Sequence, residues 1–275
     1  MNRALRTRSG SSAKDLLLTV LGEFTLPRTR SLWTSTVVDA LATFGVDERN
    51  ARQAIARLAD RDLVRSEKVG RRARWHLTGT GVHLLTAGTR RIYEFGTEPG
   101  DWDGRWLVVL CSVPENQRAK RHRLRSQLGF AGFGFIAGGV ALTPHADREA
   151  AANSVLDALD LAAGAVVFRT EPGSLVATER LLADAWDLDG LAARYGQFVA
   201  DFAGREAAGP GARFAALVEL VHEWRRFPFV DPEIPPRLLP PNWPGGRAKR
   251  LFDDLHRRWA AEAGAWYDAT EQAAE

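Results

Sequence analysis

Residues 44–77, FGVDERNARQAIARLADRDLVRSEKVGRRARWHL, carry the strongest structural signal in the chain. Gly45 interrupts the helical pattern that precedes it, as a turn glycine does. Asp47 can then cap a new helix by accepting hydrogen bonds from the first free N–H groups. Four apolar residues follow at helical spacing and predict one buried helix face: Ala51, Ala54, Ile55 and Leu58.

The opposite face of this predicted helix is polar and basic. Such side chains suit DNA, because arginine pairs with guanine edges or phosphates and glutamine pairs with an adenine edge. We therefore expect five residues of the helix to contact DNA: Arg49, Asn50, Arg52, Gln53 and Arg57.

Two strand-like runs follow the helix, Leu63–Val69 and Ala73–Leu77, and the basic tip Gly70-Arg71-Arg72 joins them. A helix for the major groove followed by a basic β-hairpin is the layout of a winged helix-turn-helix. The predicted DNA contacts of this hairpin are Lys68, Arg71, Arg72 and Arg74.

Positive charge is concentrated in this segment. From Arg49 to Arg74 there are nine basic residues and three acidic ones, whereas the whole chain has a formal net charge of +3. An electrostatic footprint for phosphates requires such a concentration. The alternative is a solvated face in an arginine-rich protein, but the turn, cap, helix and hairpin all agree with DNA binding.

The composition indicates a cytoplasmic protein with more than one domain. A chain of 275 residues with 45% hydrophobic content can bury two or three cores. Its single cysteine, Cys111, excludes an internal disulfide framework and fits a reducing compartment. The sequence shows no stretch long enough to span a membrane. Residues 1–12 are predicted to form a disordered basic tail.

The first predicted domain covers residues 13–95. Its expected helices are Ala13–Phe24, Trp33–Phe44 and Thr78–Phe95, in addition to the DNA-reading helix. The segment Gly96–Gly104 (GTEPGDWDG) has no periodicity and is predicted to be a linker.

The second predicted domain covers residues 104–176. An apolar run at Trp106–Val113 indicates a buried strand, and a very basic helix through Arg118–Leu128 follows it. Further elements are expected at Gly139–Leu142, Asp147–Leu159 and Ala165–Arg169. The resulting β–α–β–β–α–β order predicts a ferredoxin-like α/β sandwich.

The third predicted domain, residues 177–275, is helical. Its expected helices are Thr178–Trp186, Asp189–Ala203, Gly211–Phe227 and Arg247–Ala263. A proline-rich loop at residues 228–246 interrupts them, since a proline-dense segment cannot be a helix or a central strand. The fold class predicted for the chain is therefore α+β.

Taken in order, these segments resemble the PaaX family of bacterial transcriptional repressors. The residues that carry the resemblance lie at 31–64, 69–81, 90–93, 101–115, 128–145, 185–198, 220–245 and 249–255. The proline-rich part, LVHEWRRFPFVDPEIPPRLLPPNWPG, is the most specific of them. The match covers nearly the whole chain from about residue 14.

The resemblance implies a winged helix, a central ferredoxin-like domain and a helical C-terminal domain, usually in a homodimer. It also implies repression of a catabolic operon that an acyl-coenzyme A relieves; in the namesake branch, phenylacetate catabolism, this effector is phenylacetyl-CoA. The family's DNA-reading positions correspond to Arg49, Arg52, Gln53 and Arg57, with wing residues Arg71, Arg72 and Arg74.

No residue is predicted to be catalytic, and no metal or cofactor is expected. The central domain resembles small CRISPR-associated nucleases at fold level, but these use an acidic residue at the end of the first strand. Here that strand ends Cys111-Ser112-Val113, without a carboxylate for a divalent cation. The six histidines form no local metal-ligand pair. A metal-dependent nuclease therefore stays only as an alternative.

Two groups of residues could bind an acyl-CoA effector. The first is the basic helix, with Arg121 and Arg125, because CoA carries phosphates; a solvated face or extra contacts to the DNA backbone explain this helix equally well. The second offers aromatic walls and guanidinium groups beside the proline-rich loop: His222, Trp224, Arg225, Arg226 and Trp243. Its alternative is plain packing of the helical domain.

The leading hypothesis is a dimeric repressor that binds double-stranded operator DNA and a small-molecule effector. An effector-independent DNA-binding protein is the second. It predicts similar affinity for all DNA and no response to a ligand.

Overall fold

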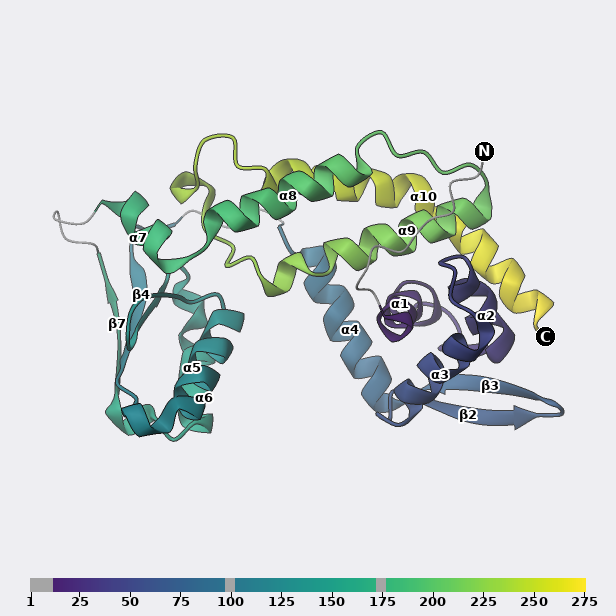
Figure 1. Ribbon diagram of the computed structural model, residues 1–275, viewed down its shortest axis with the longest axis horizontal. Coiled ribbons are helices and arrows are strands. Elements are labelled where there is room, and N and C mark those ends of the chain that lie inside the picture. Colours follow the sequence, from purple (N-terminus) through teal and green to yellow (C-terminus); the bar gives the residue numbers. More distant parts are fainter. Residues whose placement is uncertain (1–11, 97–101, 172–176) are drawn as a thin grey trace. The chain divides into compact units, whose positions relative to one another are not determined.

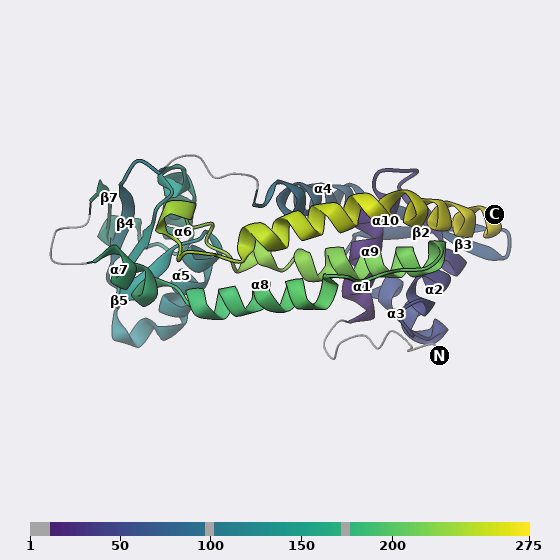
Figure 2. The ribbon, with the colours of Figure 1, turned by 90° about the horizontal axis from the view of Figure 1, so that it is seen from above.

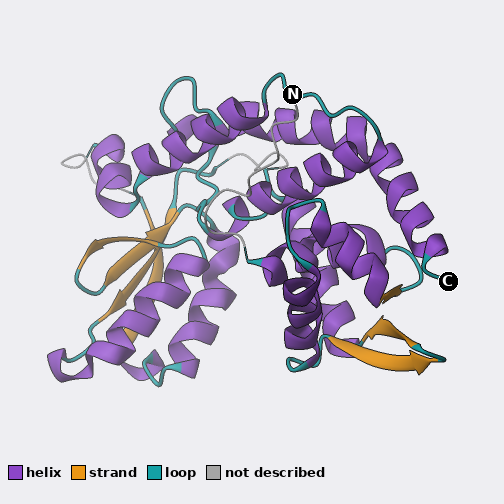
Figure 3. Ribbon diagram, turned by 45° about the vertical axis from the view of Figure 1, so that its right-hand side comes forward, coloured by secondary structure: helices purple, strands orange, loops and turns teal. Residues whose placement is uncertain are grey.

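The computed structural model describes residues 12–96, 102–171 and 177–275. The predicted basic tail, apart from Ser12, and most of the predicted linker lie outside the described residues. The fold is α+β, with helices and two antiparallel sheets (Figure 3). Contacts divide the chain into two units, the first made of residues 1–95, 198–226 and 249–275 and the second of residues 96–197 and 227–248. The segment 177–275 therefore contributes helices to both units.

The N-terminal part of the first unit contains short helices and a small sheet (Figure 1). Its elements are α1 (Ala13–Val20), a π-helical turn (Leu21–Thr25), β1 (Ser31–Trp33), α2 (Thr34–Ala42), α3 (Glu48–Ala59), β2 (Val64–Val69), β3 (Arg72–Leu77) and α4 (Gly79–Glu94). The strands are antiparallel in the order β1-β3-β2.

Strand β1 corrects the predicted start of the second helix. Trp33 was expected to begin that helix, but it ends β1 and pairs with Arg74 of β3. All three residues of β1 are buried, so a short strand places Leu32 and Trp33 in the core while pairing their backbone groups. The helix then begins at Thr34.

Two helices from the far end of the sequence complete the core of the first unit. These are α9 (Pro210–Trp224) and α10 (Gly245–Ala273), which run side by side (Figures 1 and 2). Phe214 of α9 is fully buried, with its ring 4.9 Å from that of Phe24 and 4.3 Å from that of Trp266. Helix α9 is buried along most of its length, so it acts as the central helix of this core.

Helix α10 is longer than the sequence predicted. The expected end at Ala263 was wrong, because the helix continues through Gly264 to Ala273 and has 29 residues. Tyr267 is buried in this extension, with its ring 5.3 Å from that of Phe24. Tertiary packing of the extension outweighs the cost of a glycine inside the helix, which is about 1 kcal/mol.

The second unit contains a four-stranded antiparallel sheet in the order β5-β6-β4-β7. Its elements are β4 (Trp106–Cys111), α5 (Arg118–Phe130), β5 (Gly134–Ala137), β6 (Val140–Thr143), α6 (Glu149–Ala158), β7 (Ala165–Thr170), α7 (Thr178–Ala185) and the larger part of α8 (Leu188–Phe202). The order of strands and helices up to β7 is the one that the sequence predicted.

Both faces of this sheet carry apolar residues. One face packs on α5 and α6, where Leu107 and Cys111 lie in a cluster with Leu124 and Leu156. Burial raises the pKa of the Cys111 thiol, so this residue serves as a small hydrophobe. On the other face, Trp106 packs among residues of α7 and the proline-rich loop.

The proline-rich loop is fixed to the second unit by polar contacts. The Arg148 guanidinium donates to the Pro232 carbonyl oxygen at 3.2 Å and to Glu233 Oε1 at 2.9 Å. The Tyr195 hydroxyl donates to Asp231 Oδ2 at 2.5 Å, and its ring stacks on that of Phe227 at 4.2 Å. The loop is therefore a structured part of this unit.

Candidate nucleic-acid interface

Helix α3 buries one face and exposes the other, as its sequence predicts. Ala51, Ala54, Ile55 and Leu58 are at most 2% exposed. Asp47 caps the helix, because its Oδ1 accepts a hydrogen bond from the Asn50 backbone N–H at 2.8 Å. The turn before it has Gly45 at φ 75°, a conformation that favours glycine. The orientation of α3 is thus set by burial and by its cap.

The five predicted DNA contacts of α3 all have exposed side chains. Two of them are held by neighbours on the same helix. Arg52 pairs with Glu48 at 2.7 Å, and Asn50 Nδ2 donates to Asp47 Oδ2 at 2.7 Å. Within the described part of the chain, the side chains of the other three make no hydrogen bond or ion pair: Arg49, Gln53 and Arg57. Their polar groups are available to a ligand in solvent.

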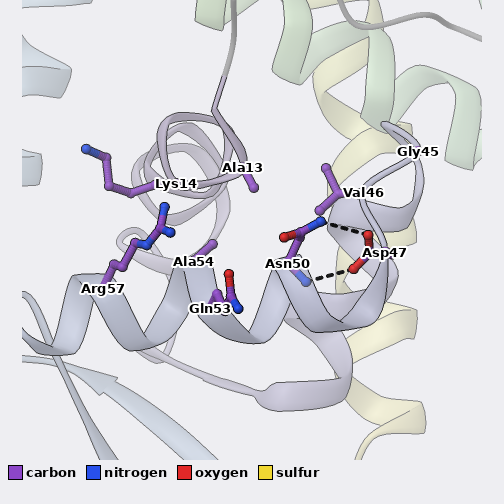
Figure 4. A pocket seen from close by; sticks show the side chains of 9 residues that line it. All are labelled: Ala13, Lys14, Gly45, Val46, Asp47, Asn50, Gln53, Ala54 and Arg57. Carbon is purple, nitrogen blue, oxygen red and sulfur yellow. Dashed lines mark hydrogen bonds between the residues drawn. The ribbon is translucent and has the colours of Figure 1, made fainter.

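A hollow of about 320 Å³ lies between the start of α1 and the exposed face of α3. Its lining includes Asn50, Gln53 and Arg57 of α3, and Lys14 of α1. Figure 4 shows Lys14 and Arg57 together at one end and Asp47 with Asn50 at the other. The cationic end suits an anionic group such as a phosphate. Lys14 was not among the predicted site residues, because nothing in the local sequence places it beside α3.

The β2–β3 hairpin has a basic tip. Val69 pairs with Arg72 across the turn, and Gly70 has φ 61°. Lys68 and Arg71 are exposed, and among the described residues their side chains make no hydrogen bond or ion pair. Figure 1 shows the hairpin extending beyond α3 within the first unit. The end of the hairpin therefore presents two cations to solvent.

Arg72 and Arg74 are instead engaged within the protein. The Arg72 guanidinium donates to the Ala274 carbonyl oxygen at 2.6 Å and lies 4.9 Å from the centroid of a Trp33 ring. The Arg74 guanidinium lies 5.2 Å from the centroid of a Trp33 ring and 4.0 Å from Glu275 Oε1. The sequence could not show the partners Ala274 and Glu275, since Ala274 lies 202 residues after Arg72. A role of Arg72 and Arg74 on DNA stays a prediction.

The first predicted effector group lies on α5. The Arg121 guanidinium donates to the Val113 carbonyl oxygen at 3.0 Å. The Arg125 guanidinium lies 4.3 Å from the centroid of the Phe135 ring. Both arginines are therefore held against the second unit.

The second predicted effector group is divided between the two units. His222 and Trp224 lie in the core of the first unit, and Trp224 Nε1 donates to the Ile92 carbonyl oxygen at 3.3 Å. Burial, and then the charges of Arg225 and Arg226, lower the pKa of His222 to about 4. His222 is thus neutral at physiological pH.

The other members of this group differ in accessibility. Arg225 is half-buried, and burial lowers its pKa, whereas Arg226 is exposed and pairs with Glu223 at 3.1 Å. Trp243 belongs to the second unit, where it meets the Tyr195 ring edge-on at 6.2 Å. Ligand binding by this set stays a prediction.

Metal-binding clusters and membrane-spanning helices are both absent from the described residues. No group of three or more His, Cys, Asp or Glu side chains there is arranged to hold a metal ion. None of the helices in the described ranges has the length and apolar character needed to cross a membrane.

Comparisons with known proteins give one consistent family. Three family models match successive parts of the chain: PaaX-like protein at residues 12–81, PaaX protein central Cas2-like domain at residues 99–182, and PaaX-like protein C-terminal domain at residues 186–269. The transcriptional repressor PaaX of Escherichia coli K12 is 26% identical over 266 residues, which cover 93% of this chain and 83% of that protein.

The fold is also found in a solved structure. An uncharacterized protein from Mycobacterium tuberculosis matches with a TM-score of 0.65 and 21% identity, over 94% of this chain and 98% of the other. At this level of identity the likeness concerns the fold. From the three family models and the full-length curated relative together, the chain belongs to the PaaX family.

Proposed function

We propose that this protein is a transcriptional repressor that binds double-stranded operator DNA through a winged helix-turn-helix formed by α2, α3 and the β2–β3 hairpin. One observation carries the proposal. Helix α3 is capped and buries its whole apolar face, while Arg49, Gln53 and Arg57 point to solvent without protein partners among the described residues. Side chains placed in this way on a fixed helix can read base edges in the major groove.

The parts of this surface have different tasks. Gln53 can pair with an adenine edge and Arg49 with a guanine edge, which gives sequence preference. Lys14 and Arg57 at the cationic end of the hollow suit a backbone phosphate. Arg71 at the hairpin tip adds a further phosphate contact, which positions the protein without selecting a sequence.

The resemblance to the PaaX family supports a proposal for the controlled genes and the effector. We propose that the protein acts as a homodimer on a catabolic operon and that an aryl- or acyl-CoA such as phenylacetyl-CoA releases it. We also propose that the central sheet, with α5 and α6, forms a ferredoxin-like sandwich. An effector weakens repression only if it binds the arrangement unable to bind DNA more tightly than the competent one.

Members of the predicted effector set would contribute in different ways. Arg226 of the first unit and Trp243 of the second each reach solvent, whereas His222 and Trp224 support the core of the first unit. Contacts from Arg121 and Arg125 would require these side chains to leave Val113 and Phe135.

The test is a fluorescence-anisotropy titration of the protein on its own promoter DNA and on a scrambled duplex at fixed salt. We expect Gln53→Ala to reduce the preference for promoter DNA about 5- to 150-fold, the effect of losing one bidentate base contact. The control Arg90→Ala removes an exposed arginine of α4 that pairs with Glu94. Equal affinity of the unmodified protein for both duplexes would refute sequence-specific repression.

The effector is tested in the same assay with a panel of acyl-CoA compounds. An acyl-CoA that lowers promoter affinity of the unmodified protein and of Arg90→Ala alike would support the proposal. Promoter affinity that none of these compounds changes would discard this effector class and keep the DNA-binding regulator.

A further inference from the structure

Helix α5 of the second unit has an unusual charge pattern. Its sequence, RAKRHRLRSQLGF, contains five arginine or lysine residues and one histidine, and no acidic residue. Leu124 and Leu128 face the sheet and are buried. The cations occupy the rest of the helix surface, so burial does not explain their number.

This pattern is electrostatically unfavourable for the helix itself. Three cations stand within its first four residues, where the helix dipole disfavours positive charge. Like charges also recur three residues apart, as in Arg118 with Arg121 and Lys120 with Arg123, and such pairs destabilise a helix. Local features that oppose stability are expected at functional sites, where a ligand compensates for them.

Three of the five cations are available for a ligand. Arg121 donates to the Val113 carbonyl oxygen, and Arg125 packs over the Phe135 ring. Within the described ranges, the side chains of the remaining three form no hydrogen bond or ion pair: Arg118, Lys120 and Arg123. Arg123 lies five residues after Arg118, about 7.5 Å along the helix axis, over which one strand of DNA carries about two phosphates.

We propose that α5 is a second contact surface for the DNA backbone, independent of sequence and separate from the α3 surface. This inference rests on the proposed function of the protein as a DNA-binding regulator. The shape of the surface favours DNA over a nucleotide-like small molecule, because the cations lie along the outside of one helix. A small-molecule site would bury most of its ligand in a concavity.

The experiment measures the salt dependence of DNA affinity. The variant Arg118→Gln/Lys120→Gln/Arg123→Gln removes three charges from α5. Its matched control, Arg105→Gln/Arg180→Gln/Arg194→Gln, removes three charges from other exposed positions of the second unit. Both full-length variants are titrated with promoter and scrambled duplexes from 50 to 200 mM salt.

We expect the α5 variant to reduce the magnitude of the slope of log affinity against log salt by about 0.9 for each lost phosphate contact, or about 1.8 for two phosphates. Affinity at low salt should fall by the same factor on both duplexes, so the preference for promoter DNA is unchanged. The control should keep the slope of the unmodified protein. A slope in the α5 variant that equals that of the control would overturn the inference.

Two further readouts keep the result unambiguous. Thermal unfolding of the α5 variant should occur at the same or a higher temperature, because like-charge repulsion is removed, so lost affinity would not reflect misfolding. An unchanged salt slope with a lost response to phenylacetyl-CoA would assign α5 to a small anion and refute the DNA contact. Failure of the proposed function itself would appear separately, as equal binding of the unmodified protein to both duplexes.

Discussion

The Thr36 hydroxyl donates a hydrogen bond to Glu271 Oε2 at 2.6 Å, and the Trp33 backbone N–H lies 3.4 Å from the same oxygen. Helix α2 has Trp33 at its N-cap position and receives no capping hydrogen bond from that side chain. A carboxylate from α10 therefore caps α2 across 235 positions of sequence. A negative charge at this end also complements the helix dipole.

Removing this carboxylate should destabilise the first unit. We expect Glu271→Ala to lower the free energy of unfolding by about 0.5–2 kcal/mol, the usual cost of losing an N-terminal cap. Urea unfolding followed by circular dichroism measures it. The control Asp254→Ala lies on the same helix but removes an exposed ion pair with Arg257, so its effect should be small. Equal unfolding midpoints for the two variants would contradict the capping role.

Neighbouring arginines of the hairpin should behave differently. Arg71→Ala should leave stability unchanged and weaken binding to promoter and scrambled DNA alike, because Arg71 has no partner among the described residues. Arg72→Ala should lower the free energy of unfolding by about 1 kcal/mol, because the variant loses the hydrogen bond to the Ala274 carbonyl oxygen and the cation–π contact with the Trp33 ring. Denaturation and DNA titration of both variants provide the comparison, which fails if Arg72→Ala unfolds like the unmodified protein.

Gly81, in the first turn of α4, has no room for a side chain. A Cβ atom on Gly81 would come within 2.0 Å of the Leu63 carbonyl oxygen, whereas a Cβ on Gly79 would meet nothing within 4 Å. We expect Gly81→Ala to destabilise the protein by about 1–3 kcal/mol through overpacking. Gly79→Ala should be neutral or slightly stabilising. Thermal unfolding of this pair separates a steric effect from a change in helix propensity, and similar melting temperatures would rule out the clash.

His222 should make stability depend on pH. Its pKa is lowered to about 4 in the folded protein, chiefly by burial. The unfolded chain then takes up the proton first, so stability decreases as pH falls from about 6.5 towards 4. The effect is on the order of 2–3 kcal/mol. His222→Gln should reduce this dependence in urea titrations at pH 7 and 4.5, whereas His122→Gln, at an exposed position, should retain it. Parallel pH profiles for both variants would exclude His222 as the source.

Local signals in the sequence were sufficient for much of the fold. Asp47 caps α3, the four apolar residues of α3 are buried, and β2 and β3 form the predicted hairpin. Each of these features depends on residues only a few positions apart. The alternation of strands and helices between Trp106 and Thr170 is also a local property, since each element has its own hydrophobic pattern.

Features that depend on distant residues were not predictable. Strand β1 exists because Leu32 and Trp33 pair with β3, and α10 continues because Tyr267 packs on Phe24. The hydrogen-bond acceptor of Arg72 and the cap of α2 come from residues 274 and 271, far along the chain. His222 shows the same limit for the effector site, because only the structure reveals its place in the core.

The reach of α10 into the first unit has a consequence for synthesis of the protein. A ribosome that has translated residue 95 has made every proposed base-reading side chain, but neither the carboxylate that caps α2 nor the carbonyl group that holds Arg72. The contacts that hold α2 and the β2–β3 hairpin are therefore incomplete until residues 271–274 have left the exit tunnel. A nascent or prematurely terminated chain would carry the positive charge without the finished α2 and hairpin. Translation to the end of the described chain thus supplies the last contacts that stabilise α2 and the hairpin.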